Sequence, residues 1–200
     1  MTTGPIPLVI VLTGPSGVGK DALIGRIVER GFPIVRPATM TTRAPRSGEM
    51  EGVHHYFVTR EEFLSNLDRG ELLEHAEVYG HLYGVPRMAV RRALESGLNV
   101  LIRVDVQGAE TLHGLLSGAL FLALEPDGID ALQHHLQARG SESPEQIERR
   151  LAVARSEMER ARQVCHPIRN VEGNRDATVD QVLAVIEEER RKGQVQEVVV

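Results

Sequence analysis

A glycine-rich segment near the start of the chain has the residue types that bind phosphate. Residues 14–21 read GPSGVGKD, in which Gly14, Gly19 and Lys20 satisfy the frame G-x4-G-K. Glycines let backbone N–H groups curl around phosphate oxygens, a following helix start adds partial positive charge, and the lysine adds a full charge. The segment is therefore predicted to bind a nucleotide. The predicted contacts are Gly14, Pro15, Ser16, Gly17, Val18, Gly19, Lys20 and Asp21.

Asp21 stands where such loops place a Ser or Thr hydroxyl that holds magnesium. A carboxylate close to a triphosphate is repelled unless a cation lies between them, so we interpret Asp21 as a magnesium ligand. On this hypothesis the substitution alters metal dependence and phosphoryl transfer persists. The alternatives are a simple helix-start residue and a loop that has lost nucleotide binding.

The segments around this loop alternate between buried strands and helices. Residues 8–14 form a continuous apolar run, typical of a strand buried on both faces of a parallel sheet, and the following residues have helical spacing as far as Gly31. Further strands are predicted at 99–106, 119–124 and near 166–171, and a last helix at about 177–192. The pattern predicts an α/β fold whose central parallel sheet is flanked by helices.

Two segments interrupt the alternation. Residues 37–85 are rich in Arg, Gly, His and Tyr with short strand-like pieces, which predicts an inserted lobe. Within 126–155, two helices flank a polar turn, and the second begins at Ser143 and Pro144, a cap followed by proline. An arginine-bearing hairpin of this kind suits a lid. We therefore expect one domain of residues 1–200, with its core at 6–36, 86–125 and 156–192, the lobe at 37–85, the lid at 126–155 and a loose tail at 193–200.

The motif TMTTRAPRSGEMEGVHHYF at residues 39–57, together with the glycine-rich loop, resembles the guanylate kinase family. The resemblance continues through 70–86, 104–109 and 138–151, and it covers about residues 8–190 in the family's order and spacing. It implies a P-loop kinase fold, ATP and magnesium (Mg2+) as cofactors, and phosphorylation of GMP, with dGMP as a candidate substrate.

Two arginines three residues apart, Arg43 and Arg46, can present guanidinium forks to one dianionic phosphate. The resemblance implies that they bind the phosphate of GMP, with Tyr83 as a helper and Glu49 as an orienting partner. Taken alone, the segment around them would read as an exposed basic turn.

Glu74 is the predicted base-reading residue. One carboxylate can accept both N1–H and the exocyclic amino group of guanine, whereas adenine has no N1–H. The resemblance adds Asp105 as a second acidic contact to guanine. The structural alternatives are a solvated charge for Glu74 and a cap at a strand end for Asp105.

The resemblance also implies residues that act on the transferring phosphoryl group. Arg139 and Arg150 match lid arginines, and such a transfer needs positioning and charge neutralisation more than covalent chemistry. The predicted catalytic set is Lys20, Arg43, Arg139 and Arg150. Asn170 is expected beside the adenine nucleotide.

Several positions depart from the common pattern of the family. His55 replaces a phosphate-binding tyrosine, and it is expected either to donate to phosphate, more strongly when protonated, or to be a surface histidine. Thr39, also in the substrate-binding set, replaces a serine. Val85 replaces a hydroxyl that contacts guanine, Arg103 replaces an acidic residue and His135 falls where a lid arginine is common. These changes bear on substrate preference and rate and leave the reaction class standing.

The composition limits the class of protein and its partners. With 200 residues, 42% of them hydrophobic, and a net charge of −5, the chain suits one globular domain and not a nucleic-acid scaffold, which needs clustered positive charge. Its single cysteine, Cys165, excludes an intramolecular disulfide and is expected to be buried. The N-terminal apolar run is too short to span a bilayer. We expect a cytoplasmic enzyme with no membrane or nucleic-acid partner, either a monomer or a homodimer.

Two other functions are compatible with parts of the sequence. A ribose 1,5-bisphosphate kinase can share the G-K-D loop, but it would not require Glu74 or the TTRAPRSGE motif. A non-catalytic guanylate-kinase-like interaction module would not require Lys20, Arg43, Arg139 and Arg150 to persist.

Overall fold

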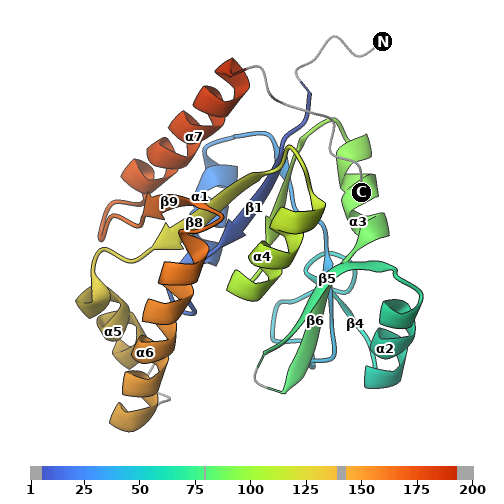
Figure 1. Cartoon of the computed structure of the whole chain (residues 1–200), viewed down its shortest axis with the longest axis horizontal. Helices are drawn as coiled ribbons and strands as arrows, with labels where there is room; N and C mark the ends of the chain where they lie inside the picture. The colour runs from blue at the N-terminus through green and yellow to red at the C-terminus, as the bar shows by residue number, and fades with distance from the viewer. Residues whose placement is uncertain (1–5, 79, 139–142, 193–200) are drawn as a thin grey trace.

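A five-stranded parallel sheet forms the centre of the protein (Figure 1). The computed structural model describes residues 6–78, 80–138 and 143–192. The sheet has the order β2-β7-β1-β8-β9, and every neighbouring pair is parallel. Its strands are β1 (Val9–Thr13), β2 (Ile34–Val35), β7 (Asn99–Arg103), β8 (Leu120–Glu125) and β9 (His166–Arg169). The predicted α/β architecture is therefore confirmed.

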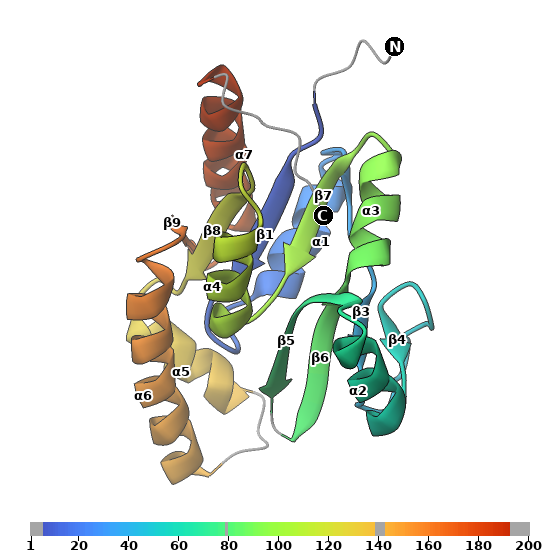
Figure 2. The ribbon, with the colours of Figure 1, turned by 45° about the vertical axis from the view of Figure 1, so that its right-hand side comes forward.

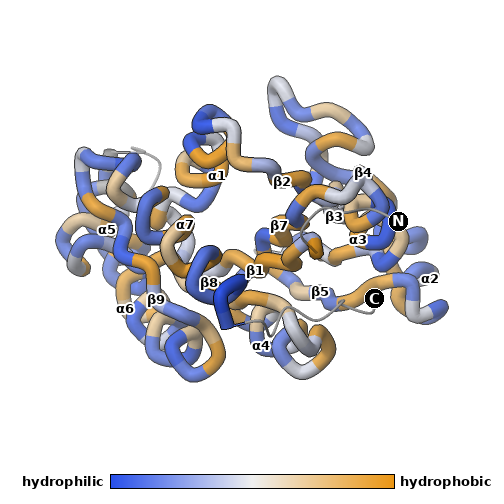
Figure 3. Tube along the Cα trace, turned by 90° about the horizontal axis from the view of Figure 1, so that it is seen from above, coloured by the Kyte–Doolittle hydropathy of each residue, from blue (hydrophilic) through white to orange (hydrophobic). Residues whose placement is uncertain are grey.

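Helices cover both faces of this sheet, which explains why its strands are apolar throughout. In β1, Val9 and Val11 pack into one hydrophobic cluster, while Ile10 and Leu12 pack into another on the opposite face. One cluster includes side chains of α3 (Arg87–Glu95) and α4 (Val106–Leu115), and the other includes those of α1 (Lys20–Glu29) and α7 (Arg175–Arg191). In Figure 3 the apolar central strands lie between α1 on one side and α4 on the other.

A second sheet of four strands in the order β4-β3-β6-β5 extends from the central one. Its strands are β3 (Thr39–Thr41), β4 (His55–Phe57), β5 (Leu72–Val78) and β6 (His81–Pro86), and α2 (Arg60–Asp68) packs against it. The sheet has its own small core, in which Phe63 of α2 is fully buried with Met40, Leu72 and Leu82. This sheet occupies the segment for which an inserted lobe is predicted.

The helices α5 (Ile129–Ala138) and α6 (Pro144–Ala161) form a hairpin around a further small core. The Ser143 side chain accepts a hydrogen bond from the backbone of Gln146, the Gln146 side chain accepts one from Ser143, and Pro144 follows at the first helical position. The predicted start of this helix is therefore confirmed. Figures 1 and 2 both show the hairpin and the second sheet extending from the end of the molecule opposite the N-terminus.

The predicted strands and last helix are present with small shifts at their ends. The largest is at residues 104–106, for which strand was predicted: β7 ends at Arg103 and α4 begins at Val106. The reason is Asp105, whose side chain accepts a hydrogen bond from the backbone N–H of Gly108 across 2.8 Å and so starts a helix. Cys165 is buried as expected. Residues 193–200, the predicted loose tail, lie outside the described residues.

A membrane-spanning helix would need about 20 consecutive apolar residues. Within the described residues, no helix is long and apolar enough to cross a bilayer.

Candidate active site

The glycine-rich loop follows β1 directly and ends at the first residue of α1. Gly14, Gly17 and Gly19 have positive φ angles of 139°, 92° and 98°. A Cβ atom at Gly14 would also lie 2.3 Å from the carbonyl oxygen of Leu124, so no side chain fits there. The Lys20 Nζ donates hydrogen bonds to the carbonyl oxygens of Gly14 and Pro15, which holds the lysine inside the loop.

Two distant side chains hold this loop from outside. The Asn170 Nδ2, just after β9, donates to the carbonyl oxygen of Val18 across 2.8 Å. From α6, the Arg150 guanidinium donates to the Ser16 hydroxyl across 2.7 Å. The structure thus brings Asn170 and Arg150 to the phosphate loop. Arg139 and the side chain of His135 lie outside the described part of the chain.

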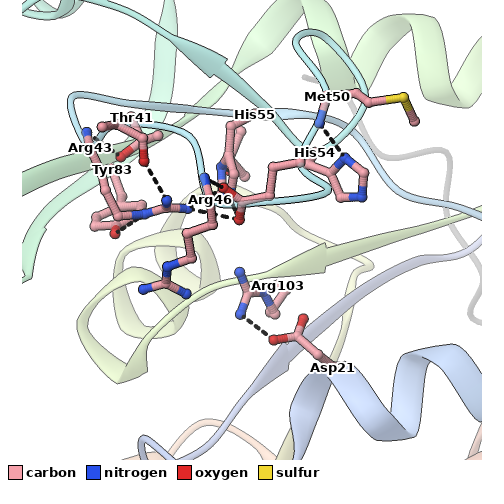
Figure 4. Close-up of polar contacts among 12 residues, drawn as sticks. Asp21, Thr41, Arg43, Arg46, Met50, His54, His55, Tyr83 and Arg103 are labelled. Atoms are coloured by element: carbon pink, nitrogen blue, oxygen red, sulfur yellow. Dashed lines mark hydrogen bonds and ion pairs between the residues drawn. The ribbon is translucent and has the colours of Figure 1, made fainter.

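Arg43, Arg46, Glu49 and Tyr83 lie together at the second sheet and are called the arginine site. Arg43 donates to both carboxylate oxygens of Glu49, at 2.9 and 3.0 Å, and its Nε donates to the Tyr83 hydroxyl across 3.2 Å. Glu49 also accepts from the backbone N–H of Arg46 across 2.7 Å. The hydrogen bonds from Arg43 lower the pKa of Glu49 to about 2, so the pair is ionised at neutral pH. Arg46 is exposed, and its guanidinium lies on the side facing Arg103 (Figure 4).

His55 is buried, so the alternative of a surface histidine is wrong. Its Nδ1 lies 2.7 Å from the Thr39 hydroxyl, and its Nε2 lies 4.0 Å from Glu49. Burial lowers the pKa of His55 below its usual value, and Arg43 and Arg103 lower it further by repulsion, although Glu49 opposes them. The imidazole is therefore neutral at pH 7, which removes the stronger, protonated form of the predicted hydrogen bond to phosphate.

Glu74 lies in β5 with 6% of its surface exposed, so the alternative of a solvated charge is wrong. Its Oε2 is buried with no hydrogen-bond partner among the described residues. Burial, helped by the negative charge of Asp105, raises the pKa of Glu74 to about 8. A Cβ atom at Gly108 would lie 2.8 Å from Oε2, so this carboxyl packs against the first turn of α4. Asp105 caps the start of that helix, whereas its structural alternative was a cap at a strand end.

Asp21 is exposed at the start of α1, and its carboxylate faces two arginines. Its Oδ2 lies 3.1 Å from Arg103 and its Oδ1 lies 3.9 Å from Arg36 (Figure 4 shows the first pair). Magnesium commonly binds one or two protein carboxylates and takes its other ligands from water and substrate phosphates, so a single exposed carboxylate beside the loop fits this ion. Within the described residues, no group of three or more His, Cys, Asp or Glu side chains is arranged to hold a metal by itself.

Sequence reasoning missed Arg36 and Glu157. Arg36 directly follows β2, and Arg103 ends the neighbouring strand β7. Charged residues at the carboxyl ends of parallel strands are a usable signal, since ligands bind at that edge of an open α/β sheet. Glu157 lies in α6, and burial raises its pKa while Lys20 lowers it. Its position gave no signal, because helical spacing alone does not show that α6 turns this side chain toward Lys20.

A parallel sheet with a glycine-rich loop and lysine after its central strand, and with an arginine brought to that loop by a helical hairpin, defines a P-loop phosphotransferase. The family model described as guanylate kinase matches residues 7–189. The chain belongs to the guanylate kinase family.

Individual relatives agree with this assignment. Guanylate kinase 2, chloroplastic/mitochondrial, of Oryza sativa subsp. japonica is 41% identical over 189 residues, which cover 94% of this chain and 66% of the rice protein. A guanylate kinase of Wolbachia sp. subsp. Brugia malayi is 36% identical over 186 residues, which cover 92% of this chain and 94% of the Wolbachia protein. The crystal structure of guanylate kinase from Anaplasma phagocytophilum matches with a TM-score of 0.74 and 30% identity, over 96% of this chain and 90% of that one.

Proposed function

We propose that this protein transfers the terminal phosphoryl group of ATP to GMP, giving ADP and GDP. Membership of the guanylate kinase family supports the reaction class. The single observation that supports guanine as the base is the Glu74 carboxyl, which is buried and has one oxygen without a hydrogen-bond partner among the described residues. An orphaned buried acceptor costs roughly 1–3 kcal/mol, so a ligand that supplies donors at this point binds with that advantage.

Guanine offers two adjacent donors, and the ionised Glu74 carboxylate accepts both. Adenine presents an acceptor at N1, and the ionised Glu74 carboxylate has no proton to donate to it, so this form of Glu74 disfavours AMP. Gly108 leaves room for this carboxyl, because any side chain there would displace it. Asp105, whose charge already acts on Glu74, is the second acidic group on the guanine side.

The phosphate of GMP is proposed to bind at the arginine site of the second sheet. Arg43 and Arg46 supply the positive charge, and the Tyr83 hydroxyl supplies a neutral donor. The Glu49 carboxylate holds both arginines, because it accepts hydrogen bonds from the Arg43 guanidinium and from the backbone N–H of Arg46. His55, hydrogen-bonded to Thr39, contributes a neutral imidazole at this site.

The phosphates of ATP are proposed to bind in the glycine-rich loop with Lys20. In the transfer, an ionised oxygen of the GMP phosphate attacks the terminal phosphorus of ATP and forms a new P–O bond. The bond from this phosphorus to the bridging oxygen breaks, and ADP leaves with the electron pair of that bond. No general base is needed, because the attacking oxygen carries no proton. Arg150 and Arg139 neutralise the transferring group, and Asn170 supports the loop beside the adenine nucleotide. Magnesium, when bound with Asp21, supplies further charge neutralisation.

The remaining features of this proposal concern the whole enzyme. The second sheet (37–85) and the helical hairpin (126–155) are proposed to close over the two nucleotides as a GMP-binding lobe and a lid. We expect dGMP to be accepted, since the named contacts read the base and the phosphate and not the 2′-hydroxyl. The enzyme is proposed to act in the cytosol, as a monomer or a homodimer, on small nucleotides and not on nucleic acid.

A coupled assay with magnesium and ATP tests the proposal by offering GMP, AMP and ribose 1,5-bisphosphate separately. GMP is expected to be phosphorylated far faster than the other two. Lys20→Ala should remove most of this activity, and the matched control is Lys192→Ala, which changes the chain's only other lysine, exposed at the end of α7. Turnover of the sugar phosphate but not of GMP would overturn the proposal. Absence of any ATP binding would favour an interaction module.

A further inference from the structure

The ion pair between Asp21 and Arg103 joins the start of α1 to the end of β7. The two carboxylate oxygens of Asp21 face different arginines, Oδ2 facing Arg103 at 3.1 Å and Oδ1 facing Arg36 at 3.9 Å. Since β2, β7 and β1 are neighbours in the parallel sheet, all three residues come to the edge from which the phosphate loop emerges. The arrangement is therefore part of the phosphate site.

Positive charge is concentrated at this edge. Lys20 is partly buried, is held by the carbonyl oxygens of Gly14 and Pro15, and directly precedes Asp21, whose Oδ2 lies 3.1 Å from Arg103. The Arg36 guanidinium lies 3.9 Å from the other oxygen of the same carboxylate. The single charge of Asp21 offsets the three positive charges of Lys20, Arg36 and Arg103 only in part. Like charges held together in this way are relieved by a polyanionic ligand.

Arg103 lies between the two sites that are proposed to bind phosphate. On one side it pairs with Asp21 beside the phosphate loop at 3.1 Å, and on the other its charge contributes to the lowered pKa of His55 in the second sheet. Figure 4 shows the same arrangement, with the Arg103 guanidinium between Asp21 and the cluster of Arg43, Arg46 and His55. A group in this position is near the phosphoryl group that passes from one nucleotide to the other.

We propose that Arg103 contacts the nucleotide phosphates during transfer, and that Asp21 is a positioning residue that holds the Arg103 guanidinium beside the phosphate loop. One N–H group of Arg103 donates to Asp21, and the planar fork has others that can reach phosphate oxygens. A guanidinium fixed in advance loses less conformational freedom when the phosphates bind. A metal ion at Oδ2 would compete with this guanidinium, so the positioning role of Asp21 belongs to the metal-free protein.

The proposal rests on the proposed function for the identity of the ligand, and its test separates the two. Calorimetry measures ATP binding in the presence of EDTA, so neither magnesium nor GMP turnover enters the result. The variants are Arg103→Gln, Arg103→Lys, Asp21→Asn and the double variant. Arg30→Gln is the matched control. Arg30 caps the C-terminal end of α1, opposite the end that carries Asp21, and its side chain is 31% exposed, like that of Arg103. It pairs with Asp180 of α7 across 2.6 Å.

Arg103→Gln is expected to weaken metal-free ATP binding about tenfold, the size of one lost charge-assisted hydrogen bond. Arg103→Lys should recover part of the loss and Arg30→Gln should bind as the unchanged protein does. Asp21→Asn should also weaken binding, and the double variant should be no weaker than Arg103→Gln. Equal binding by Arg103→Gln and the unchanged protein would overturn the contact. Tighter metal-free binding by Asp21→Asn would overturn its positioning role and favour a direct magnesium ligand.

These outcomes do not depend on whether GMP is the acceptor. If the coupled assay showed no phosphorylation of GMP while Arg103→Gln still weakened ATP binding, the proposed function would fail and the assignment of Arg103 would stand. If GMP were phosphorylated and Arg103→Gln bound ATP as well as the unchanged protein does, the proposed function would stand and the assignment of Arg103 would fail.

Discussion

The Glu74 carboxyl titrates in an unusual range because it is buried near Asp105, and this makes stability depend on pH. Its pKa is raised from the ordinary 4.5, which applies to the unfolded chain, to about 8 in the folded protein. Between these values the folded state holds a proton that the unfolded state has lost, so the free energy of unfolding falls as pH rises. The cost by pH 8 is roughly 3–5 kcal/mol.

Glu74→Gln removes this titration while keeping the shape of the side chain. We expect the variant to match the unchanged protein in urea denaturation at pH 5 and to exceed it in stability at pH 8. An identical fall in stability for both proteins over this range would show that the carboxyl ionises freely in the folded state.

The glycine against this carboxyl gives a second prediction. Gly108→Ala would place a Cβ atom 2.8 Å from Glu74 Oε2 and 2.9 Å from the Val104 side chain, so it should weaken GMP binding about tenfold or more and lower stability by roughly 1–3 kcal/mol. The matched control is Gly114→Ala in the same helix, where the new Cβ meets nothing within 4 Å. That change should stabilise by up to about 1 kcal/mol. Urea denaturation and GMP calorimetry measure both effects, and equal behaviour of the two variants would refute the close packing at Gly108.

The residue types of Glu74, Arg43 and Lys20 were predictable because each has a chemical reason to stand near a nucleotide. The environments of the site residues were not predictable from the sequence. The burial of His55 depends on Thr39 and Tyr83, which come from other strands. The pairing of Asp21 with Arg103 likewise joins positions 82 residues apart, and the sequence contains no local signal for it.

At the scale of elements, the phosphate loop depends on a residue from the far end of the chain. Asn170→Asp keeps the shape of the side chain but removes the donor to Val18 and adds negative charge beside the loop. The KM for ATP should rise about tenfold in steady-state assays, with little change in KM for GMP. The control is Asn66→Asp, since the Asn66 Nδ2 donates across the same 2.8 Å to the carbonyl oxygen of Glu62 in helix α2. A larger effect on GMP than on ATP would contradict the proposed support of the ATP loop.

Elements with local signals were predicted well. The start of α6 was readable from Ser143 and Pro144, because capping chemistry acts over three or four residues. The end of β7 was misplaced because apolar residues recur at Val104 and Val106, whereas the hydrogen bond from Gly108 to Asp105 starts a helix there. The strand order of both sheets depends on long-range pairing and was not predicted from the sequence.

At the scale of the whole molecule, the second sheet has a small core of its own besides the residues Leu73 and Val85 that it contributes to the central cluster. The small core can therefore be loosened while most of the central core stays packed. Phe63→Ala empties the core of the second sheet and should cost roughly 3–5 kcal/mol there. Hydrogen exchange should rise in residues 39–78 and 80–86, and GMP binding should weaken, while ATP binding stays within about twofold. Leu64→Ala, one residue along and 42% exposed, is the control and should change stability by no more than about 0.5 kcal/mol. Equal loss of ATP binding would show that the two sheets unfold together.

The most direct test of guanine recognition by Glu74 is the number of protons released when GMP binds. Calorimetric titrations at pH 7 in two buffers with different heats of ionisation give this number for the unchanged protein and for Glu74→Gln, with GMP at millimolar concentration. Because the free carboxyl is mostly protonated at pH 7 and guanine needs it ionised, the unchanged protein should release close to one proton more than the variant. Equal proton release by the two proteins, with GMP bound to both, would contradict the assignment of Glu74 as the residue that reads the base.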